Sequence, residues 1–226
     1  MRIHKTTPFT GEGLLTGLLW VLLMAVLAPA PAAAQAPRRF KAGIIAGVTA
    51  SQIDGDESAG YNKVGLQGGL RGIIVLKKKQ DLSVEILFTQ RGCRNEAKTP
   101  PFFKTTLDYI EVPVQWHYHD WPANDDSDEP EYYRVHFNTG LSYGRLLDYK
   151  DDTDGTIAGI TPALPFLNRN SVCFLIGASF FATKHLGFTV RYHRAFNRLY
   201  EPGQPGSNYA YSLNEHFLAF QTMYVF

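Results

Sequence analysis

The sequence lacks several features that would indicate a nucleic-acid-binding protein, an enzyme or a helical membrane protein. Lys and Arg number 22 against 21 Asp and Glu, a net charge of +1, so no charge excess favours nucleic acid as a partner. We find no nucleophile motif and no phosphate-binding glycine loop, and we therefore expect no catalytic residue and no cofactor. The mean hydropathy is only −0.17, and beyond residue 28 no apolar run approaches the length of a membrane-spanning helix.

The first 34 residues have the pattern of a cleaved signal peptide. A basic start precedes the apolar run Leu14–Ala28, which is short for a membrane-spanning helix. The small residues of Pro29–Ala36 follow, and we place cleavage after Ala34, with Ala36 as the alternative. The sequence therefore predicts export, with the mature domain spanning residues 35–226.

Two segments near the middle of the chain alternate between apolar and polar residues, with Leu87 as an apolar residue on the polar face. In Leu82–Arg91, the residues Val84, Ile86 and Phe88 share one face, and Thr105–Tyr118 repeats the pattern. A period of two indicates strands, and one apolar face opposite one charged face is typical of a membrane barrel with a polar interior. Such a barrel has low mean hydropathy, because half of each strand faces the lumen.

About eight such segments follow the signal, which predicts an all-β fold: a single antiparallel up-and-down transmembrane β-barrel. An even number places both ends of the mature chain on one side, with the long loops on the other. The acidic connection His119–Glu131 is longer than a turn on the short side should be, and Pro113 predicts a bulge or bend. The expected strands are Phe40–Ser51, Val64–Leu76, Leu82–Arg91, Thr105–Tyr118, Tyr132–Leu146, Ser171–Phe181, Leu186–Asn197 and His216–Phe226.

The last strand carries outward aromatic residues and ends on one. Phe220, Tyr224 and Phe226 form the pattern read by the barrel-assembly machinery, which we expect as a partner during insertion, with outer-membrane lipid around the mature protein.

Charged residues fall on the inward face of several strands. Because a barrel of about eight strands is just wide enough for side chains to fill, these charges must pair or be hydrated. We favour a structural polar network over a selective pore. Its predicted members are Arg71, Glu85, Arg91, Glu111, Arg134 and Arg191.

No metal or catalytic site is predicted. Glu85 and Glu111 could form a carboxylate pair, but nothing indicates a substrate cleft between them. His117 and His119 have a chelating spacing without a third ligand, and Asp151–Gly155 lacks the ends of a calcium loop. Cys93 and Cys173 could form a disulfide across the lumen or stay as two inert thiols.

Four motifs in order resemble the PorT-like outer-membrane β-barrel family of Bacteroidetes. They are AGIIAGVTASQIDGD (Ala42–Asp56), GYNKVGLQGGL (Gly60–Leu70), LSVEILFTQRG (Leu82–Gly92) and LDYIEVPV (Leu107–Val114). The resemblance implies a barrel in the outer membrane, without catalytic residues, and an association with protein secretion machinery.

Three functions remain open at this point. The first is a structural or interaction protein of the outer membrane, whose loops contact other envelope or secretion proteins. The second is a small-solute channel or pore. The third is an exported lipocalin-like barrel, which requires the apolar faces to point inward. We do not expect an enzyme.

Overall fold

The structure, a computed structural model, describes residues 39–56, 58–95, 102–123, 132–153 and 159–226. The predicted signal peptide (1–34) and most of the acidic connection His119–Glu131 lie outside these residues. Within the described ranges, no helix is both long enough and apolar enough to cross a membrane.

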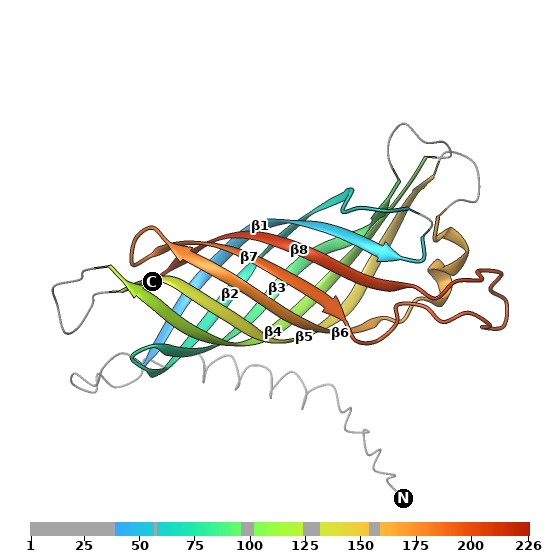
Figure 1. Ribbon diagram of the computed structural model, residues 1–226. Helices are drawn as coiled ribbons and strands as arrows, with labels where there is room; N and C mark the ends of the chain where they lie inside the picture. Colours follow the sequence, from blue (N-terminus) through green and yellow to red (C-terminus); the bar gives the residue numbers. More distant parts are fainter. Residues whose placement is uncertain (1–38, 57, 96–101, 124–131, 154–158) are drawn as a thin grey trace, which may run out of the picture. The chain divides into compact units, whose positions relative to one another are not determined.

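Eight antiparallel strands follow one another in chain order around a closed barrel, which confirms the predicted fold class (Figure 1). The barrel closes where the first strand pairs with the last, with Gly43 opposite Val225 and Asp54 opposite Asn214. A 3-10 helix, η1, spans Thr161–Phe166. The strands are β1 (Phe40–Asp54), β2 (Lys63–Lys77), β3 (Gln80–Arg94), β4 (Phe103–Pro122), β5 (Tyr133–Thr153), β6 (Asn170–Phe181), β7 (Leu186–Ala195) and β8 (Asn214–Val225).

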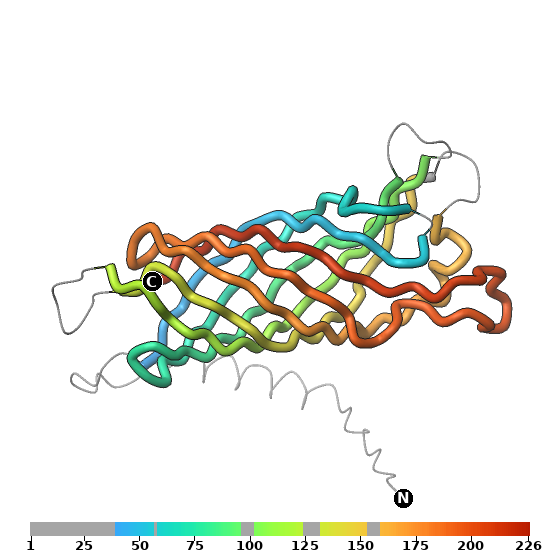
Figure 2. Tube along the Cα trace, in the orientation of Figure 1, coloured from blue at the N-terminus to red at the C-terminus, as the bar shows by residue number. Residues whose placement is uncertain are grey.

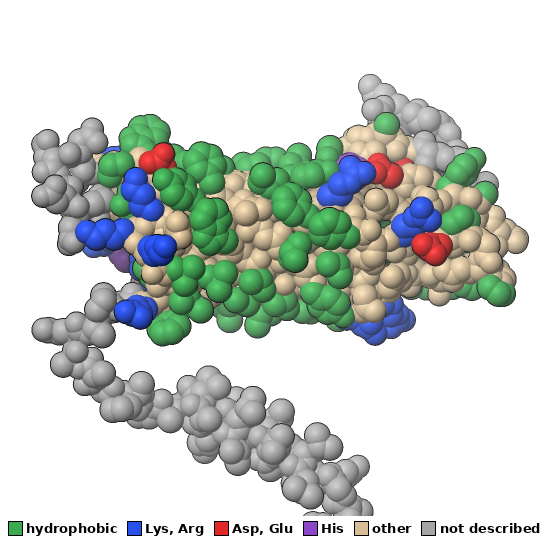
Figure 3. Space-filling view, turned by 60° about the horizontal axis from the view of Figure 1, so that its bottom comes forward, with side chains coloured by type: hydrophobic (Ala, Val, Ile, Leu, Met, Phe, Trp, Pro, Cys, Tyr) green, Lys and Arg blue, Asp and Glu red, His purple; other side chains and the backbone are tan. Residues whose placement is uncertain are grey.

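The apolar face of each strand points outward and the charged face points into the lumen. On β3, Ile86 is 58% exposed, whereas its neighbour Glu85 is fully buried. Figure 3 shows hydrophobic side chains along the barrel wall, with charged side chains gathered toward the two ends of the face in view. This orientation is the one that a lipid-facing wall requires.

The two ends of the barrel differ in their connections. At one end, the short-turn end, β2 and β3 are joined by the turn Lys78–Lys79, and β6 and β7 by Ala182–His185. The first residue of β1 and the last of β8 lie at this end too, as Figure 2 shows for the carboxyl terminus. The opposite, long-loop end carries η1 and the connection between β7 and β8.

The strands β4 and β5 extend further than the sequence predicts. The expected ends at Tyr118 and Leu146 were wrong, because pairing continues to Phe103 opposite Thr153 and to Pro122 opposite Tyr133. Asp148–Asp152 therefore belong to β5 and not to a loop. Lys104 stands opposite Asp152 there, and this cross-strand pair of opposite charge favours a hairpin that continues past the barrel wall.

The bulge expected at Pro113 is absent. Val84 pairs with Val114 and Leu87 with Glu111 in the same register, so no residue is inserted, although the ladder to β3 is interrupted between these two pairs. The register shift of β4 lies instead at Asp108 and Tyr109, opposite β5.

Two adjacent glycines of β2 provide a test of how closely the strands approach. A Cβ on Gly69 would overlap the carbonyl oxygen of Ile86, whereas a Cβ on Gly68 would lie 3.4 Å from the nearest atom, the carbonyl oxygen of Ile45. We expect Gly69→Ala to lower the free energy of unfolding by about 2 kcal/mol or more, because backbone must shift, and Gly68→Ala by less than about 0.5 kcal/mol. Urea titration of the refolded barrel in micelles, followed by tryptophan fluorescence, measures both. Equal unfolding midpoints for the two variants would contradict this account.

Candidate functional site in the barrel interior

Three arginines and three glutamates fill the middle of the lumen. Each is at most 4% exposed, and their formal charges cancel. The arginines come from β2, β3 and β7 and the glutamates from β3, β4 and β8, so five strands contribute to one set. The members of this set, the ionic core, are Arg71, Arg91, Arg191, Glu85, Glu111 and Glu215.

The ionic core has two halves, and Glu85 is the carboxylate of the half that lies nearer the short-turn end. Arg191 donates to it through both terminal nitrogens, at 2.9 and 3.2 Å. Arg71 lies beside the same carboxylate, with its Nε 3.7 Å from Oε1. A two-pronged arginine–carboxylate contact is among the strongest hydrogen-bonded pairs in proteins, and it fixes β7 against β3 across the lumen.

Arg91 is the centre of the other half. Its guanidinium lies 2.9 Å from Glu111 and 3.3 Å from Glu215, and so joins β3, β4 and β8. The guanidinium is stacked between the rings of Tyr109 and Phe217, at 4.6 and 4.3 Å from their centroids. Burial removes the hydration of the Arg91 charge. Cation–π attraction to the two rings and ion pairs with the two carboxylates compensate for this loss.

Buried histidines and hydroxyls complete the bonding of these charges. The ring of His117 contacts Arg71 at 2.9 Å and Ser83 at 2.7 Å, and His193 lies 3.3 Å from Glu111. Ser171 donates to Glu215 at 2.7 Å. In the described part of the chain, no group of three or more His, Cys, Asp or Glu side chains is placed to hold a metal ion.

An apolar cluster closes the lumen at the long-loop end. It combines strand residues such as Ile53 and Leu107 with Leu164 of η1 and with Leu199 and Leu213 from the connection between β7 and β8. A smaller cluster that includes Phe181 and Met223 lies at the short-turn end. The ionic core therefore lies between two apolar layers, which limit its access to water.

The structure brings together five of the six residues predicted for the lumen network. Arg134 is the exception: it has the inward parity but lies half-buried at the start of β5, and it has no ion pair with any described residue. Sequence reasoning missed Glu215, because the last strand was expected to begin at His216. Continuing its alternation backward from Phe217 would have found this carboxylate.

The remaining predicted residues lie apart from the ionic core. His119 stacks on His136 at 3.9 Å and lies 3.1 Å from Asp81, away from His117. Asp151 accepts hydrogen bonds from the hydroxyls of Thr105 and Thr161, at 2.9 and 2.7 Å, so it anchors η1 to the β4–β5 hairpin. Phe220, Tyr224 and Phe226 point outward and are 44, 43 and 66% exposed.

The two cysteines are free thiols. Cys93 belongs to the apolar cluster at the long-loop end, whereas Cys173 lies beside Ser171, with its sulfur 3.4 Å from the hydroxyl oxygen. Of the two alternatives left open by the sequence, the disulfide is therefore absent, since β3 and β6 are not neighbours in the barrel.

Residues 32–201 match the family of the outer membrane protein beta-barrel domain, which is more than half of the chain. No protein with a curated description matches the chain significantly.

Several solved structures of small barrels are similar at low identity. Ail, the attachment invasion locus protein of Yersinia pestis, is 11% identical with a TM-score of 0.43, covering 82% of this chain and 98% of Ail. Neisserial surface protein A is 11% identical with a TM-score of 0.42, covering 84% of this chain and 99% of that one. OprG of Pseudomonas aeruginosa is 11% identical with a TM-score of 0.39, covering 82% of this chain and 96% of OprG.

Replacing Arg91 tests whether the ionic core stabilises the barrel. We expect Arg91→Met to lower the free energy of unfolding by about 3–5 kcal/mol, because it leaves Glu111 and Glu215 buried without a cation. The outward, exposed Arg194 gives the matched control, and Arg194→Met should change stability by less than about 0.5 kcal/mol. Urea unfolding in micelles measures both. Similar, small effects of the two substitutions would show that the core charges do not stabilise the fold.

A second test concerns Asp56, which follows β1 at the long-loop end and is 2% exposed. Its Oδ1 accepts a hydrogen bond from the backbone N–H of Ser58 at 2.9 Å, yet burial raises the pKa of the Asp56 carboxyl to about 6. The folded protein therefore holds a proton that the unfolded chain has released between about pH 4 and pH 6, so stability falls as the pH rises through this window.

We expect this carboxyl to cost at most about 3 kcal/mol of stability at pH 7 relative to pH 4. The variant Asp56→Asn should then be more stable than the wild type at pH 7, and the difference should shrink toward pH 4. Unfolding midpoints measured at a series of pH values provide the readout. A difference that does not depend on pH would contradict the assignment.

Proposed function

The chain belongs to the outer membrane protein beta-barrel domain family and lies in the outer membrane, and we propose that it is a structural or interaction protein there. Its barrel serves as a closed anchor, and its loops contact other proteins of the cell envelope. On the four motifs quoted above, we further propose a role like that of PorT-like proteins, in association with protein secretion machinery.

The filled lumen is the observation that carries this proposal. Eight strands enclose an interior just wide enough for side chains, and here six charged residues of zero net charge occupy its middle. A pore that selects ions needs a hydrated path lined by charge of one sign. In the ionic core each charge instead lies beside an opposite charge, which favours an anchoring role over a conducting one.

Exposed aromatic side chains near the barrel ends favour contact with other proteins. Tyr211, in the connection between β7 and β8, is 53% exposed, and Trp121, near the end of β4, is 60% exposed. Aromatic residues are enriched at protein interfaces because they bury a large area at a small cost in conformational entropy.

The alternative, a small-solute channel, is favoured by a cavity of about 160 Å³ at the short-turn end. Arg71 lines this cavity, but its neighbours Glu85 and His117 are fully buried, so side chains fill the lumen beyond it. The lipocalin-like alternative requires apolar side chains inside, and the described strands have the opposite orientation.

Planar-bilayer recording tests the closed lumen. We expect the refolded protein to give no unitary current steps, under conditions in which a known porin inserted by the same procedure does, because the ionic core blocks the path. Current steps whose size changes with Arg71→Ala would support the channel instead.

The interaction role needs a separate readout from the same preparation. Extraction from cells in mild detergent should yield a complex larger than the monomer, and Tyr211→Ala should weaken it more than the lumen-neutral control Arg194→Met. A monodisperse monomer in every extract would contradict the interaction role while leaving the closed barrel intact.

A further inference from the structure

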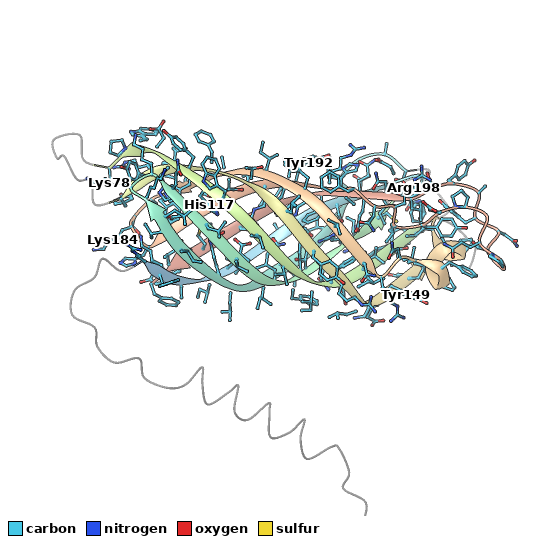
Figure 4. All side chains as sticks on the ribbon, turned by 90° about the horizontal axis from the view of Figure 1, so that it is seen from below. Lys78, His117, Tyr149, Lys184, Tyr192 and Arg198 are labelled. Atoms are coloured by element: carbon cyan, nitrogen blue, oxygen red, sulfur yellow. The ribbon has the colours of Figure 1, made fainter. Side chains whose placement is uncertain are left out.

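The outer face of β5 and β6 shows where the apolar wall ends toward the long-loop end. Three successive outward pairs change there from apolar through amphipathic to polar. They are Leu141–Phe174, Tyr143–Val172 and Arg145–Asn170. Tyr143 is 49% exposed, and a tyrosine in this position is typical of the level at which a barrel wall meets the lipid headgroups. Figure 4 shows Tyr149, further along β5, at this end of the barrel, which in bacterial barrels faces the outside of the cell.

Arg145 is held in place by a neutral partner. Its Nη1 donates to Oδ1 of Asn170 at 2.7 Å, and the hydroxyl of Tyr143 donates to the same oxygen at 2.8 Å. No carboxylate in the described part of the chain forms an ion pair with Arg145. A guanidinium has five N–H donors, so the bond to Asn170 fixes the side chain and leaves most of its donors and its whole charge for an external anion.

A second arginine occupies the neighbouring position on the next strand. The backbone N–H of Leu146 donates to the carbonyl oxygen of Arg169 at 2.8 Å, which places Arg169 beside the backbone of Arg145. The side chain of Arg169 is exposed and lines a cavity of about 90 Å³ together with Asp148. Asp148 accepts a hydrogen bond from the backbone N–H of Tyr149 at 2.9 Å, and no ion pair within the described ranges joins it to Arg169. Two arginines therefore lie directly beyond the apolar wall.

The end of the apolar wall is built differently on β3 and β4. Phe88 and Ile110 form the last outward apolar pair there, and Gln90 and Asp108 form the pair that follows. The side-chain amide of Gln90 donates to Asp108 at 2.9 Å, so these two groups bond to each other. A headgroup anion finds exposed cationic donors on β5 and β6, whereas on β3 and β4 it meets a carboxylate.

We propose that the arginine pair, Arg145 and Arg169, binds the phosphate group of an anionic lipid in the leaflet around the long-loop end. Guanidinium groups match phosphate oxygens with two parallel hydrogen bonds. The acyl chains of the same lipid continue along the exposed side chains of Leu141 and Val172. A lipid therefore gains polar and apolar contacts together, whereas a soluble phosphate gains only the polar ones. Lipid selection of this kind goes beyond the anchoring role proposed above.

The test is a titration of the refolded mature chain with dioleoyl phosphatidic acid in maltoside micelles, in which native mass spectrometry counts the bound lipids. We expect Arg145→Gln and Arg169→Gln each to raise the dissociation constant of the first lipid about fivefold, the usual contribution of one basic residue beside an anionic lipid surface. The control Lys150→Gln removes an exposed charge further along β5 and should leave the constant unchanged. The mobility of unboiled samples on a gel verifies that every variant is folded.

Other ligands separate a lipid phosphate site from its alternatives. Dioleoyl phosphatidylcholine should bind at least about fivefold more weakly than phosphatidic acid, because its headgroup has no net charge. Equal constants for the wild type and both arginine variants, or equal affinity for oleate, which carries a carboxylate, would overturn the proposal. Competition by glycerol phosphate at the same concentration as phosphatidic acid would also overturn it, since the acyl chains would then contribute nothing. These readouts do not depend on conduction or on protein complexes, so failure here leaves the proposed function standing.

Discussion

Closure of the barrel places charged side chains where water cannot solvate them, and the rest of the interior follows from this constraint. A buried charge is tolerated only if an opposite charge and hydrogen bonds replace its hydration. Glu85 meets Arg191 and Arg71, and Arg91 meets Glu111 and Glu215. Two of these contacts, Arg191–Glu85 and Arg91–Glu215, join strands that are not neighbours in the barrel, so electrostatic pairing also braces the wall from inside.

The outside of the barrel, in contrast to the lumen, is covered by exposed apolar side chains. Side chains such as Leu70 and Ile86 are more than half exposed on the barrel surface, an arrangement that would be unfavourable in water. In a membrane the same side chains contact lipid, and the closed ring of strands pairs the backbone behind them with neighbouring strands. One face of each strand is therefore suited to lipid, and the other is suited to the paired charges of the lumen. A shift of the pattern by one residue would place Glu85 in lipid.

Much of the fold could be predicted from the sequence because a period of two is a strong signal when repeated eight times. The strand ends could not, since β4 and β5 continue past the apolar belt, where pairs such as Lys104 and Asp152 carry no alternation of hydropathy. Alternation along each strand could predict which residues face the lumen, but it could not predict which of them contact one another across it. Arg134 has the correct parity but no ion-pair partner among the described residues, whereas Glu215 was missed by one residue at a strand end.

The two free thiols have a consequence for how this chain is made. An exported protein with a required disulfide depends on an oxidant and on isomerases to correct wrong bridges. Here Cys93 and Cys173 are each 1% exposed and separated by the barrel interior. The finished molecule therefore needs no redox chemistry for its maturation, and its sulfur atoms become reachable by a thiol reagent only when the wall itself comes apart.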